Sequence, residues 1–399
     1  MAIGMTVVAL TGCVGEGRTD RTADLTDTTI DDVDVMVEPS TAAPTVTSGE
    51  HRGDAAAAEF TRSLFAKLPD DEPGCTVAVG RGGEVVFAEA YGAARLDPFE
   101  PMTVDTVVDI GSVSKQFTAT AILLLAERGA VDLDAPLSTY LPDLPDWASR
   151  ATVAQLIHHK SGIPDYIGLL VERGFVVTGS SPTMADALAA LRDVHDLRFA
   201  PGARWEYSNS NYFLLSQVVL AVTGEDLGAF LASEVFEPLG LDMVMDPIAA
   251  IEDKAVSYQD AGGEWQVADS RWEPTIGAGA IQTTPSQLVA WAAQYWEPTI
   301  GAPTINAERF EAAVVAPVVA NVDVQGGIRY GAGIYEGDVG GDVGRVLSHG
   351  GSWGGFRTVF SVAPAHRVAV AVTCTSPSAW RRLRRTFDID VLASWIGSD

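Results

Sequence analysis

The stretch GSVSKQFTATAILLL, residues 111–125, decides the fold of this chain. Ser112 and Lys115 stand three positions apart, so a helix places them on one face, close enough to form a hydrogen bond. The residues after them are nearly all apolar as far as Leu125. This pattern predicts a buried helix with the Ser–Lys pair at its N-terminal end, and Gly129 is a plausible stop for it.

A Ser–Lys pair of this kind has a chemical use. A serine hydroxyl is a poor nucleophile until a base removes its proton, and a neutral lysine amine can be that base. Burial disfavours the charged amine and would draw Lys115 towards neutrality. The chain contains only four lysines, at positions 67, 115, 160 and 254. Arg cannot lose its proton, so Lys115 is a candidate for proton transfer. The alternative is a helix cap followed by a lysine that reaches solvent.

The second group of candidate residues is Tyr207-Ser-Asn209. A phenol oxygen near Ser112 could relay its proton, helped by Lys115 stabilising the phenolate. The Asn209 amide could donate to a substrate carbonyl or hold the lysine. An ordinary turn into a helix explains the same residues, because Asn and Ser are common helix caps.

The third group is SHGGS, which ends at Ser352 and lies between two strand-like runs. Adjacent glycines in a strand indicate close backbone approach, so Gly350 and Gly351 would form an edge along which a substrate lies. The backbone N–H groups of Ser112 and Ser352 could form an oxyanion hole. His349 would place a polarisable donor beside the tyrosine. A Gly-rich hairpin with a surface histidine is the alternative.

Strand signals occur at both ends of the chain, with helix signals between them. We predict an α+β fold in which both chain ends share one antiparallel sheet, flanked by the first and last helices, with a mostly helical insertion at about residues 126–300. The expected helices are residues 55–68 and 380–396. The expected strands are residues 75–79, 84–88, 331–336, 346–349, 357–363 and 367–373, with a turn at 80–83.

The N-terminal residues indicate targeting rather than fold. Residues 2–10 are apolar but too short to span a bilayer, and LTGC follows, as in a bacterial lipobox. Residues 1–13 are therefore expected to be a lipoprotein signal with Cys13 as the lipidation site, although no Lys or Arg precedes the apolar run. The alternative is that the LTGC sequence occurs here by chance and is not a lipobox. Residues 14–54 contain ten acidic residues, three basic residues and eight Thr, a composition typical of a disordered linker.

The composition of the chain limits the kinds of molecule that it is expected to bind. The chain has 399 residues, a formal net charge of −27 and 47% hydrophobic residues. This balance argues against nucleic acid, and no phosphate loop or dinucleotide motif suggests a cofactor. The expected partners are a small-molecule or peptide substrate and, through a lipid at Cys13, a membrane. We therefore expect an exported protein, with domain residues at 55–399.

Three other patterns in the sequence have simpler explanations than a functional site. The sequence GGSWG around Ser352 fits the G-x-S-x-G elbow of α/β-hydrolases, but that elbow needs a helix after it and an acid before a later histidine. A strand-like run follows here, and no Asp or Glu lies between Ser352 and His366. His158 and His159 are neighbours without a third ligand at a familiar spacing, so no metal is expected. The arginines at 381, 382, 384 and 385 are expected to form ion pairs.

In this order and spacing, the three groups resemble the serine β-lactamase and D,D-peptidase superfamily, whose pattern is S-x-x-K, Y-x-N and then K-T-G or H-x-G. Residues 155–165, 199–202 and 277–285 look similar too, and the resemblance covers about residue 55 to the end. It implies that Ser112 is acylated and that Lys115 and Tyr207 handle its proton and the leaving group. It also implies that Asn209 orients this pair or the substrate amide.

The resemblance implies further that the N–H groups of Ser112 and Ser352 form the hole and that His349 stands where many relatives have Lys. Gly350 replaces a Thr whose hydroxyl helps to hold a substrate carboxylate. His349 is mostly neutral at pH 7. Both the hydroxyl and the positive charge that would bind a substrate carboxylate are therefore missing. This disfavours efficient β-lactamase action and leaves a D-alanyl-D-alanine carboxypeptidase or D-aminoacyl hydrolase and an esterase as equals. A penicillin-binding sensor without turnover is a further alternative.

A disulfide is implied by the same resemblance. In this family the first strand lies antiparallel beside the last, so the start of one meets the end of the other. Cys75 opens the first strand and Cys374 closes the last. We therefore predict a Cys75–Cys374 disulfide, which an exported protein would retain.

Overall fold

The structure is a computed structural model, and it describes residues 54–301, 313–314, 327–383 and 386–397. The expected signal peptide over residues 1–13, including Cys13, lies outside the described residues. So does the expected linker over residues 14–54, apart from Asp54. The expected domain boundaries and lipid anchor therefore remain predictions.

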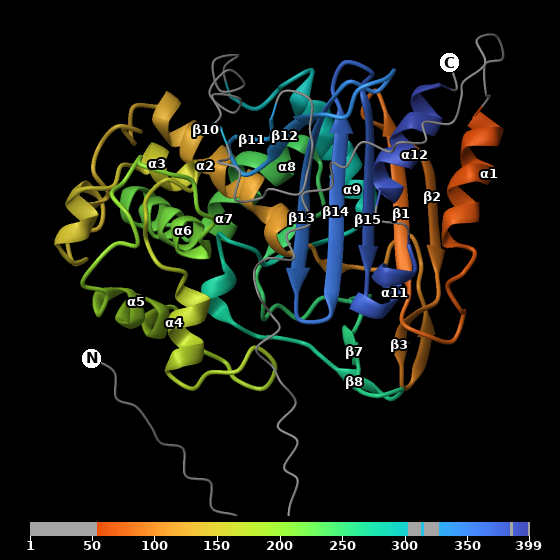
Figure 1. Cartoon of the computed structure of the whole chain (residues 1–399), viewed down its shortest axis with the longest axis horizontal. Coiled ribbons are helices and arrows are strands. Elements are labelled where there is room, and N and C mark those ends of the chain that lie inside the picture. The colour runs from red at the N-terminus through yellow and green to blue at the C-terminus, as the bar shows by residue number, and fades with distance from the viewer. Residues whose placement is uncertain (1–53, 302–312, 315–326, 384–385, 398–399) are drawn as a thin grey trace, which may run out of the picture. The chain divides into compact units, whose positions relative to one another are not determined.

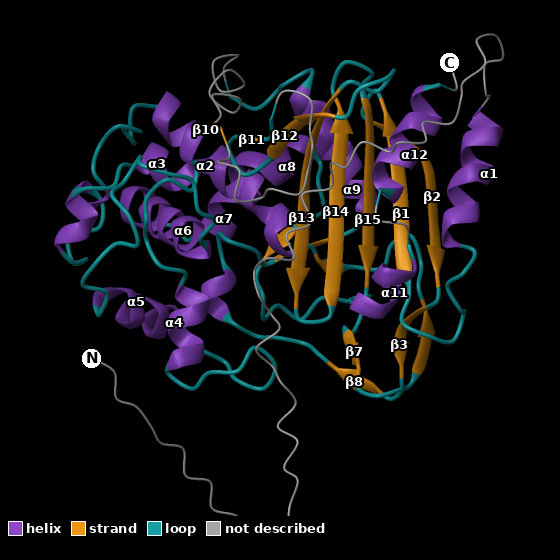
Figure 2. Cartoon of the chain, viewed as in Figure 1, coloured by secondary structure: helices purple, strands orange, loops and turns teal. Residues whose placement is uncertain are grey.

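An eight-stranded antiparallel sheet lies at the centre of the described residues (Figures 1 and 2). Its order is β10-β11-β12-β13-β14-β15-β1-β2, so strands from both chain ends share it. The α+β fold class is thus confirmed. The strands are β1 (Cys75–Arg81), β2 (Glu84–Tyr91), β10 (Ala313–Val314), β11 (Arg329–Tyr330), β12 (Tyr335–Asp338), β13 (Arg345–Trp353), β14 (Phe356–Ala363) and β15 (Val368–Cys374).

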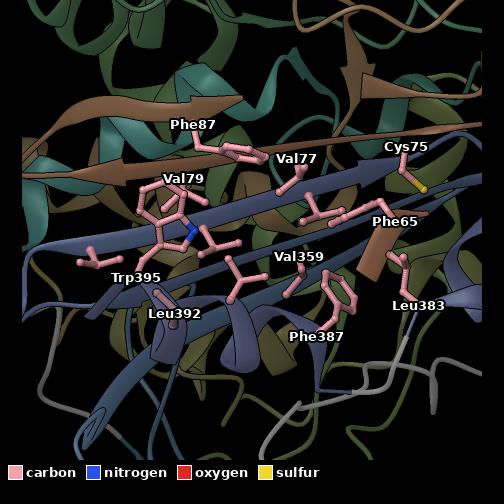
Figure 3. Close-up of a cluster of buried hydrophobic side chains, with 14 of the residues drawn as sticks. Phe65, Cys75, Val77, Val79, Phe87, Val359, Leu383, Phe387, Leu392 and Trp395 are labelled. Carbon is pink, nitrogen blue, oxygen red and sulfur yellow. The ribbon is translucent and has the colours of Figure 1, made fainter. Parts of the chain in front are cut away.

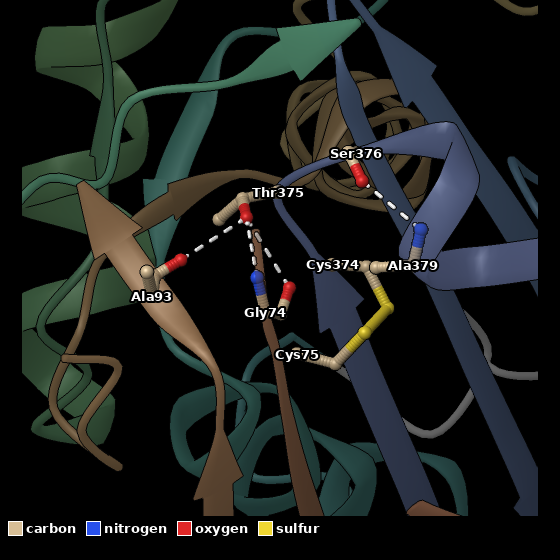
Figure 4. The surroundings of a disulfide bond; sticks show 7 residues. All are labelled: Gly74, Cys75, Ala93, Cys374, Thr375, Ser376 and Ala379. Carbon is tan, nitrogen blue, oxygen red and sulfur yellow. Dashed lines mark hydrogen bonds between the residues drawn. A yellow bond between two sulfur atoms is a disulfide. The ribbon is translucent and has the colours of Figure 1, made fainter. Parts of the chain in front are cut away.

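β1 and β15, the first and last strands of the sheet in chain order, are neighbours in it and are joined covalently (Figure 4). β1 pairs antiparallel with β15 over its whole length, and Cys75 lies opposite Cys374. These two buried cysteines form a disulfide across 299 residues of sequence. Thr375 Oγ1 accepts a hydrogen bond from Gly74 N at 3.0 Å beside it. The bond implied by the family resemblance is therefore present.

One face of the sheet is covered by α1 (Asp54–Phe65) and α12 (Phe387–Ile396), which contact each other. α12 packs on β14 and β15, and side chains of α1 pack against Phe87 and Tyr91 of β2. Every second residue of these strands points towards the two helices, because side chains alternate along a strand. The resulting core is almost entirely apolar (Figure 3). It includes Phe65, Val77, Val79, Val359, Val370, Val372, Phe387, Leu392 and Trp395.

The opposite face of the sheet meets the helical part of the chain. α9 (Pro285–Trp291) packs on β1, β2 and β15. A Cβ atom on Gly80 of β1 would lie 2.9 Å from Val289 Cβ of α9, so glycine permits this approach. β13 contacts the short helix η3 (Gly111–Ser114), which leads directly into α2 (Lys115–Glu127). This face therefore joins the sheet to the predicted nucleophile.

Most of the described helices lie between η3 and β10. Besides α2 and α9, they are η4 (Leu137–Thr139), η5 (Asp146–Ser149), α3 (Val153–Ile157), α4 (Tyr166–Glu172), α5 (Met184–Arg192), α6 (Asn209–Thr223), α7 (Leu227–Leu231), η6 (Ala232–Phe236), α8 (Glu237–Leu239), η7 (Glu273–Thr275) and η8 (Ala292–Tyr295). α2 ends where predicted, before Gly129 with φ +69°. Among the described residues, no single helix has the length and apolar character to cross a bilayer; only the bent pair Asn209–Thr223 and Leu227–Leu239 meets that test together.

Three small sheets accompany the large one. β5 (Val108–Asp109) and β6 (Val244–Met245) both pair with β9 (Ile281–Thr283). β3 (Ala93–Leu96) pairs with β4 (Phe99–Pro101), and β7 (Tyr258–Asp260) pairs with β8 (Trp265–Val267). The first of these small sheets anchors the segment before Ser112, because Ile110 N donates to Ile281 O at 3.0 Å.

Several predicted boundaries were wrong. The first hairpin turns at Gly82 and Gly83 alone, because a bulge between Val79 and Gly80 keeps Gly80 within β1. Residues 331–336 are not one strand: residues 331–334 form the turn between β11 and β12, and residues 335–336 begin β12. Gly333 in this turn has φ +76°, and a Cβ atom on it would lie 2.5 Å from Gln116 N.

The C-terminal segment also differs from its prediction. The helix expected over residues 380–396 is two helices, α11 (Pro377–Arg382) and α12. α11 starts earlier than expected because the Ser376 side chain caps it, accepting from Ala379 N at 3.0 Å (Figure 4). Of the four arginines in the basic run, Arg382 forms an ion pair with Glu72, and residues 384–385 lie outside the description.

Candidate active site

The turn that carries Ser112 is pressed against strand β13. Gly111 has φ +52°, and a Cβ atom on it would lie 2.7 Å from Ser352 N. A Cβ atom on Gly351 would lie 2.0 Å from Ile110 O and 3.4 Å from Ser112 N. The backbones of the two predicted oxyanion donors therefore approach each other closely, and both glycines are required for this contact.

Lys115 is the first residue of α2 and is completely buried. Its Nζ lies 3.0 Å from Ser112 Oγ, 2.8 Å from Asn209 Oδ1 and 2.7 Å from Ala278 O. Burial lowers the pKa of Lys115 well below its usual value, and the nearby Asp165 acts in the opposite direction. The predicted Ser–Lys contact is thus formed, with an amine that burial holds towards neutrality.

Tyr207 lies just before α6, and its ring centroid is 4.8 Å from Lys115 Nζ. The Tyr207 hydroxyl oxygen is buried and forms no hydrogen bond among the described residues. Burial raises the pKa of Tyr207 well above its usual value, while the neighbouring Ser112 hydroxyl acts in the opposite direction. The phenol therefore stays protonated at neutral pH, unlike the phenolate considered from the sequence.

Asn209 is the first residue of α6, and its side chain connects two ionisable groups. Its Oδ1 accepts from Lys115, and its Nδ2 donates to Asp165 Oδ2 at 3.0 Å. The backbone N–H of Asn209 donates to the same Asp165 oxygen at 2.6 Å. Of the two functions that the sequence allowed for Asn209, holding the lysine is the one made in this structure.

His349 is buried on β13 and faces the same region. Its Nδ1 lies 2.6 Å from Gly350 O, a carbonyl that can only accept, so Nδ1 carries the proton. Its Nε2 lies 3.3 Å from Tyr330 Oη and is left to accept. Burial lowers the pKa of His349 to about 3, with Lys115 adding to the effect. His349 is therefore a neutral ring whose one N–H is already used, not the free donor expected beside Tyr207.

The glycines of the third group lie inside β13 rather than in a loop. β12 pairs with β13 only from Arg345 to Ser348, whereas β14 pairs with it as far as Trp353. Within the described strands, the edge of β13 from Gly350 onwards is therefore paired on one side only. β14 follows Ser352 in the chain, so the strand–elbow–helix arrangement of α/β-hydrolases is absent at this serine.

The sequence interpretation missed several residues around the site. Asp165 ends the stretch 155–165 that supported the resemblance, but no function was assigned to it. Trp205, Tyr330 and Tyr335 pack around His349 and Tyr207, with ring centroids 4.6 to 6.4 Å apart. Only the abundance of aromatic residues near Tyr207 could have indicated this cluster.

His159 also belongs to this region, whereas no metal site does. The His159 ring lies 4.3 Å from the Tyr207 ring, and its Nδ1 accepts from Ser208 N at 3.2 Å. No group of three or more His, Cys, Asp or Glu among the described residues is arranged to hold a metal ion. His159 therefore lines the site as a buried structural residue.

Comparison with known proteins points the same way as the geometry. A family model described as Beta-lactamase matches residues 61–393. The D-aminopeptidase of Brucella anthropi is 32% identical over 298 residues, which cover 71% of this chain and 52% of that protein. Penicillin-binding protein 4* of Bacillus subtilis (strain 168) is 26% identical over 317 residues, covering 73% of this chain and 66% of that protein. The chain thus spans about half the length of the D-aminopeptidase.

A solved structure supports the fold. The octameric penicillin-binding protein homologue from Pyrococcus abyssi superimposes with a TM-score of 0.74 at 24% identity, covering 87% of this chain and 78% of that one. The family match spans both chain ends and the helical part between them, including all three groups of site residues. The chain therefore belongs to the Beta-lactamase family, among the penicillin-recognising serine hydrolases that its three motifs resemble.

Proposed function

We propose that this protein hydrolyses an amide or ester through an acyl-enzyme on Ser112. The observation that carries the proposal is the set of contacts around Lys115 Nζ. Asn209 Oδ1 and Ala278 O can only accept, so a neutral amine uses its two N–H groups on them. Its lone pair is then left for the Ser112 hydroxyl 3.0 Å away. Lys115 is the general base in this proposal.

An oxyanion hole completes the acylation step. Attack by Ser112 on a carbonyl places negative charge on the carbonyl oxygen, and N–H donors aimed at that oxygen lower the barrier. The close approach of Ser112 N and Ser352 N supports their assignment as the two donors. Each such donor contributes about 10²–10³-fold in rate. Tyr207, protonated and beside Lys115, is the group that passes the proton to the leaving group.

The substrate we propose has no carboxylate next to the bond that is cleaved. A β-lactam or a peptide C-terminus carries such a carboxylate, and its recognition needs a cation or hydroxyl near the third motif. Here His349 is neutral and Gly350 has no side chain. A D-aminoacyl amide, or the corresponding ester, fits this site better. The 32% identity to a D-aminopeptidase supports the D-aminoacyl class.

We also propose that the protein is exported and attached to a membrane through a lipid on Cys13. The Cys75–Cys374 disulfide supports export, because such bonds persist outside the reducing cytoplasm. The LTGC sequence and the acidic linker after it support the anchor. Metabolic labelling with a radioactive fatty acid, comparing the wild type with Cys13→Ala, tests this part.

One panel tests the hydrolase proposal. The purified protein is mixed separately with a D-alanine amide, a short-chain nitrophenyl ester, a D-Ala-D-Ala peptide and a chromogenic cephalosporin, and intact mass follows adducts. Ser112→Ala should abolish turnover and adducts with all four. Ser63→Ala on α1 is the control, because Ser63 is an exposed helix serine whose hydroxyl donates to Phe60 O of its own helix.

The panel also decides between substrate classes. We expect turnover of the amide or the ester, little of the peptide and less of the cephalosporin. Turnover of the ester alone would assign an esterase. A stable cephalosporin adduct together with no turnover of any of the four compounds would assign a sensor and overturn the hydrolase proposal. Full activity of Ser112→Ala would also overturn it.

A further inference from the structure

Asp165 lies behind the site and receives only N–H donors. It caps α4, where its Oδ1 accepts from Ile167 N at 2.9 Å. Its Oδ2 accepts from both the backbone N–H and the side-chain Nδ2 of Asn209. All three partners donate, so the ionised carboxylate is the form that satisfies every contact. Burial raises the pKa of Asp165, whereas these N–H donors and Lys115 lower it.

This carboxylate determines how the Asn209 amide is oriented. An amide can place either its oxygen or its NH₂ group towards a neighbour, but a carboxylate can only accept. The NH₂ group of Asn209 must therefore face Asp165, which leaves Oδ1 for Lys115. Lys115 must therefore donate an N–H to Asn209 Oδ1, and this leaves its lone pair directed to Ser112. A neutral amide at position 165 would remove this constraint.

The loop that carries Asp165 also holds the chain around Tyr207. His159 O accepts from Glu206 N at 2.9 Å, and His159 Nδ1 accepts from Ser208 N at 3.2 Å. Pro164 O accepts from the Ser210 hydroxyl at 2.5 Å. Residues 159–165 therefore fix the backbone of residues 206–210 at several points, and Asp165 has a defined position relative to Asn209.

Asp165 is also the acidic group that acts on Lys115. The ionisable groups around the Lys115 amine are Asp165 from the start of α4, Tyr207 and Tyr212 from the α6 region, His159 from the loop before α4, and His349 from β13. The tyrosines and histidines are neutral, because burial opposes the charged form of each. Asp165 is the group in this set that raises the pKa of Lys115.

We propose that Asp165 is a positioning residue for the Ser112 site: it orients the Asn209 amide and, through it, the Lys115 amine. Its negative charge also opposes the effect of burial on Lys115, so removing that charge should shift the pH range in which Lys115 is a free base. The inference rests on the proposed function of Lys115 as the base. It assigns to Asp165 an effect on both the rate and its pH dependence, which a plain helix cap would not have.

The test uses two matched variants of the full chain. Asp165→Asn removes the charge but keeps a good N-cap for α4. Asp226→Asn is the control, because Asp226 caps α7 in the same way, with its Oδ1 accepting from Ala229 N at 2.9 Å. Two readouts are measured against pH: the rate of Ser112 labelling by a fluorophosphonate, and the Lys115 Cε resonance in protein with isotope-labelled lysine. With four lysines in the chain, assignment is simple.

We expect Asp165→Asn to lower the plateau labelling rate by about 10- to 100-fold, because the base is no longer held in line. Loss of the negative charge should move the Lys115 titration, and the acidic limb of the labelling profile, to lower pH by about one unit. The control should match the wild type in both. If Asp165→Asn is too unstable to purify, Asp165→Glu keeps the charge and should lose plateau rate without the shift to lower pH.

The outcomes separate this inference from the proposed function. Fluorophosphonate labelling that survives Ser112→Ala would refute Ser112 as the nucleophile whatever Asp165 does. An unchanged Lys115 titration and plateau rate in Asp165→Asn would overturn the inference alone. A loss of rate in Asp165→Asn with no shift of the Lys115 resonance would overturn the electrostatic part of the inference. If Asp226→Asn lost as much rate as Asp165→Asn, the loss in each variant would be an effect on stability.

Discussion

The two faces of the central sheet are built from the same strands but have different uses. The face under α1 and α12 carries Val and aromatic side chains in a continuous apolar core. On the opposite face, β1 and β15 carry small residues, namely threonines, alanines and Gly80. β14 adds Phe360 to this face, and β13 carries His349, with the Ser112 turn against that strand. In β15, Val370 and Val372 point to the first face and Ala371 and Thr373 to the second.

This difference shows how one sheet can serve stability and chemistry together. Large side chains on the first face bury apolar area, which stabilises the fold. Small side chains on the second let backbone come close to backbone, as at Gly351 and the Ser112 turn. Substitutions on the first face should therefore reduce stability and leave the site intact, whereas substitutions on the second should reduce activity.

The disulfide belongs to the first face and should have the largest effect on stability. Replacing both cysteines, as in Cys75→Ala/Cys374→Ala, frees a loop of 299 residues in the unfolded chain. The expected loss is about 6 kcal/mol in the chain-entropy model. Urea unfolding of the variant and of the oxidised wild type measures it. The folded variant should keep wild-type kcat, and a large loss of kcat would contradict the separation of the two faces.

Trp395 tests the apolar core itself. It is buried on α12, packs 5.7 Å from the Phe87 ring and donates to Thr61 Oγ1 at 3.1 Å. Trp395→Ala should cost about 3–5 kcal/mol of unfolding free energy through the cavity it leaves. Denaturant titration measures this loss, and ester hydrolysis at a temperature where the variant is folded should be unchanged within a factor of two or so.

Gly351→Ala is the corresponding test on the second face. A methyl group there would meet Ile110 O at 2.0 Å and push β13 away from the Ser112 turn. We expect a loss of about 10²–10³-fold in kcat/KM, the effect of losing one oxyanion donor. Gly350→Ala is the comparison, because the nearest atom to its Cβ would be 3.8 Å away. Equal activity of the two variants would argue against the predicted hole.

The smallest expected effect on stability comes from Asp388, a buried carboxyl group on α12 at the first face of the sheet. Its Oδ2 accepts from Ser361 Oγ at 2.5 Å, and burial raises the pKa of Asp388 to about 6. The folded state therefore binds this proton more tightly than the unfolded state, so its contribution to stability is lost as pH rises from about 4 to about 6. Asp388→Asn should be more stable than the wild type at pH 8 by about 1–3 kcal/mol, with no gain near pH 4. Urea titrations at both pH values measure the difference.

Much of the fold was predictable because its signals are local. Alternating apolar residues indicated β1, β14 and β15, and the apolar run after Lys115 indicated α2. The failures were also local conflicts. Residues 331–336 look like one strand, but Gly333 must adopt a left-handed turn against the start of α2. The helix expected over residues 380–396 became two helices, α11 and α12.

In the candidate site, too, the contacts within one local element were predictable and those between distant segments were not. Spacing alone predicted the contact between Ser112 and Lys115, since both lie within one helical turn. Asp165 could not be identified, because it acts on Asn209 across 44 residues of sequence. The state of His349 was equally hidden, since its bonds to Gly350 and Tyr330 depend on how β11, β12 and β13 pair.

By itself the sequence determined which groups could do chemistry and on which local element each lies, because helical spacing and strand alternation are properties of a few consecutive residues. Only the tertiary structure decided their protonation and orientation. Those depend on burial and on hydrogen-bond partners from distant segments. Lys115 is a possible base because Asn209, Ala278 and Asp165, brought together by folding, surround one amine.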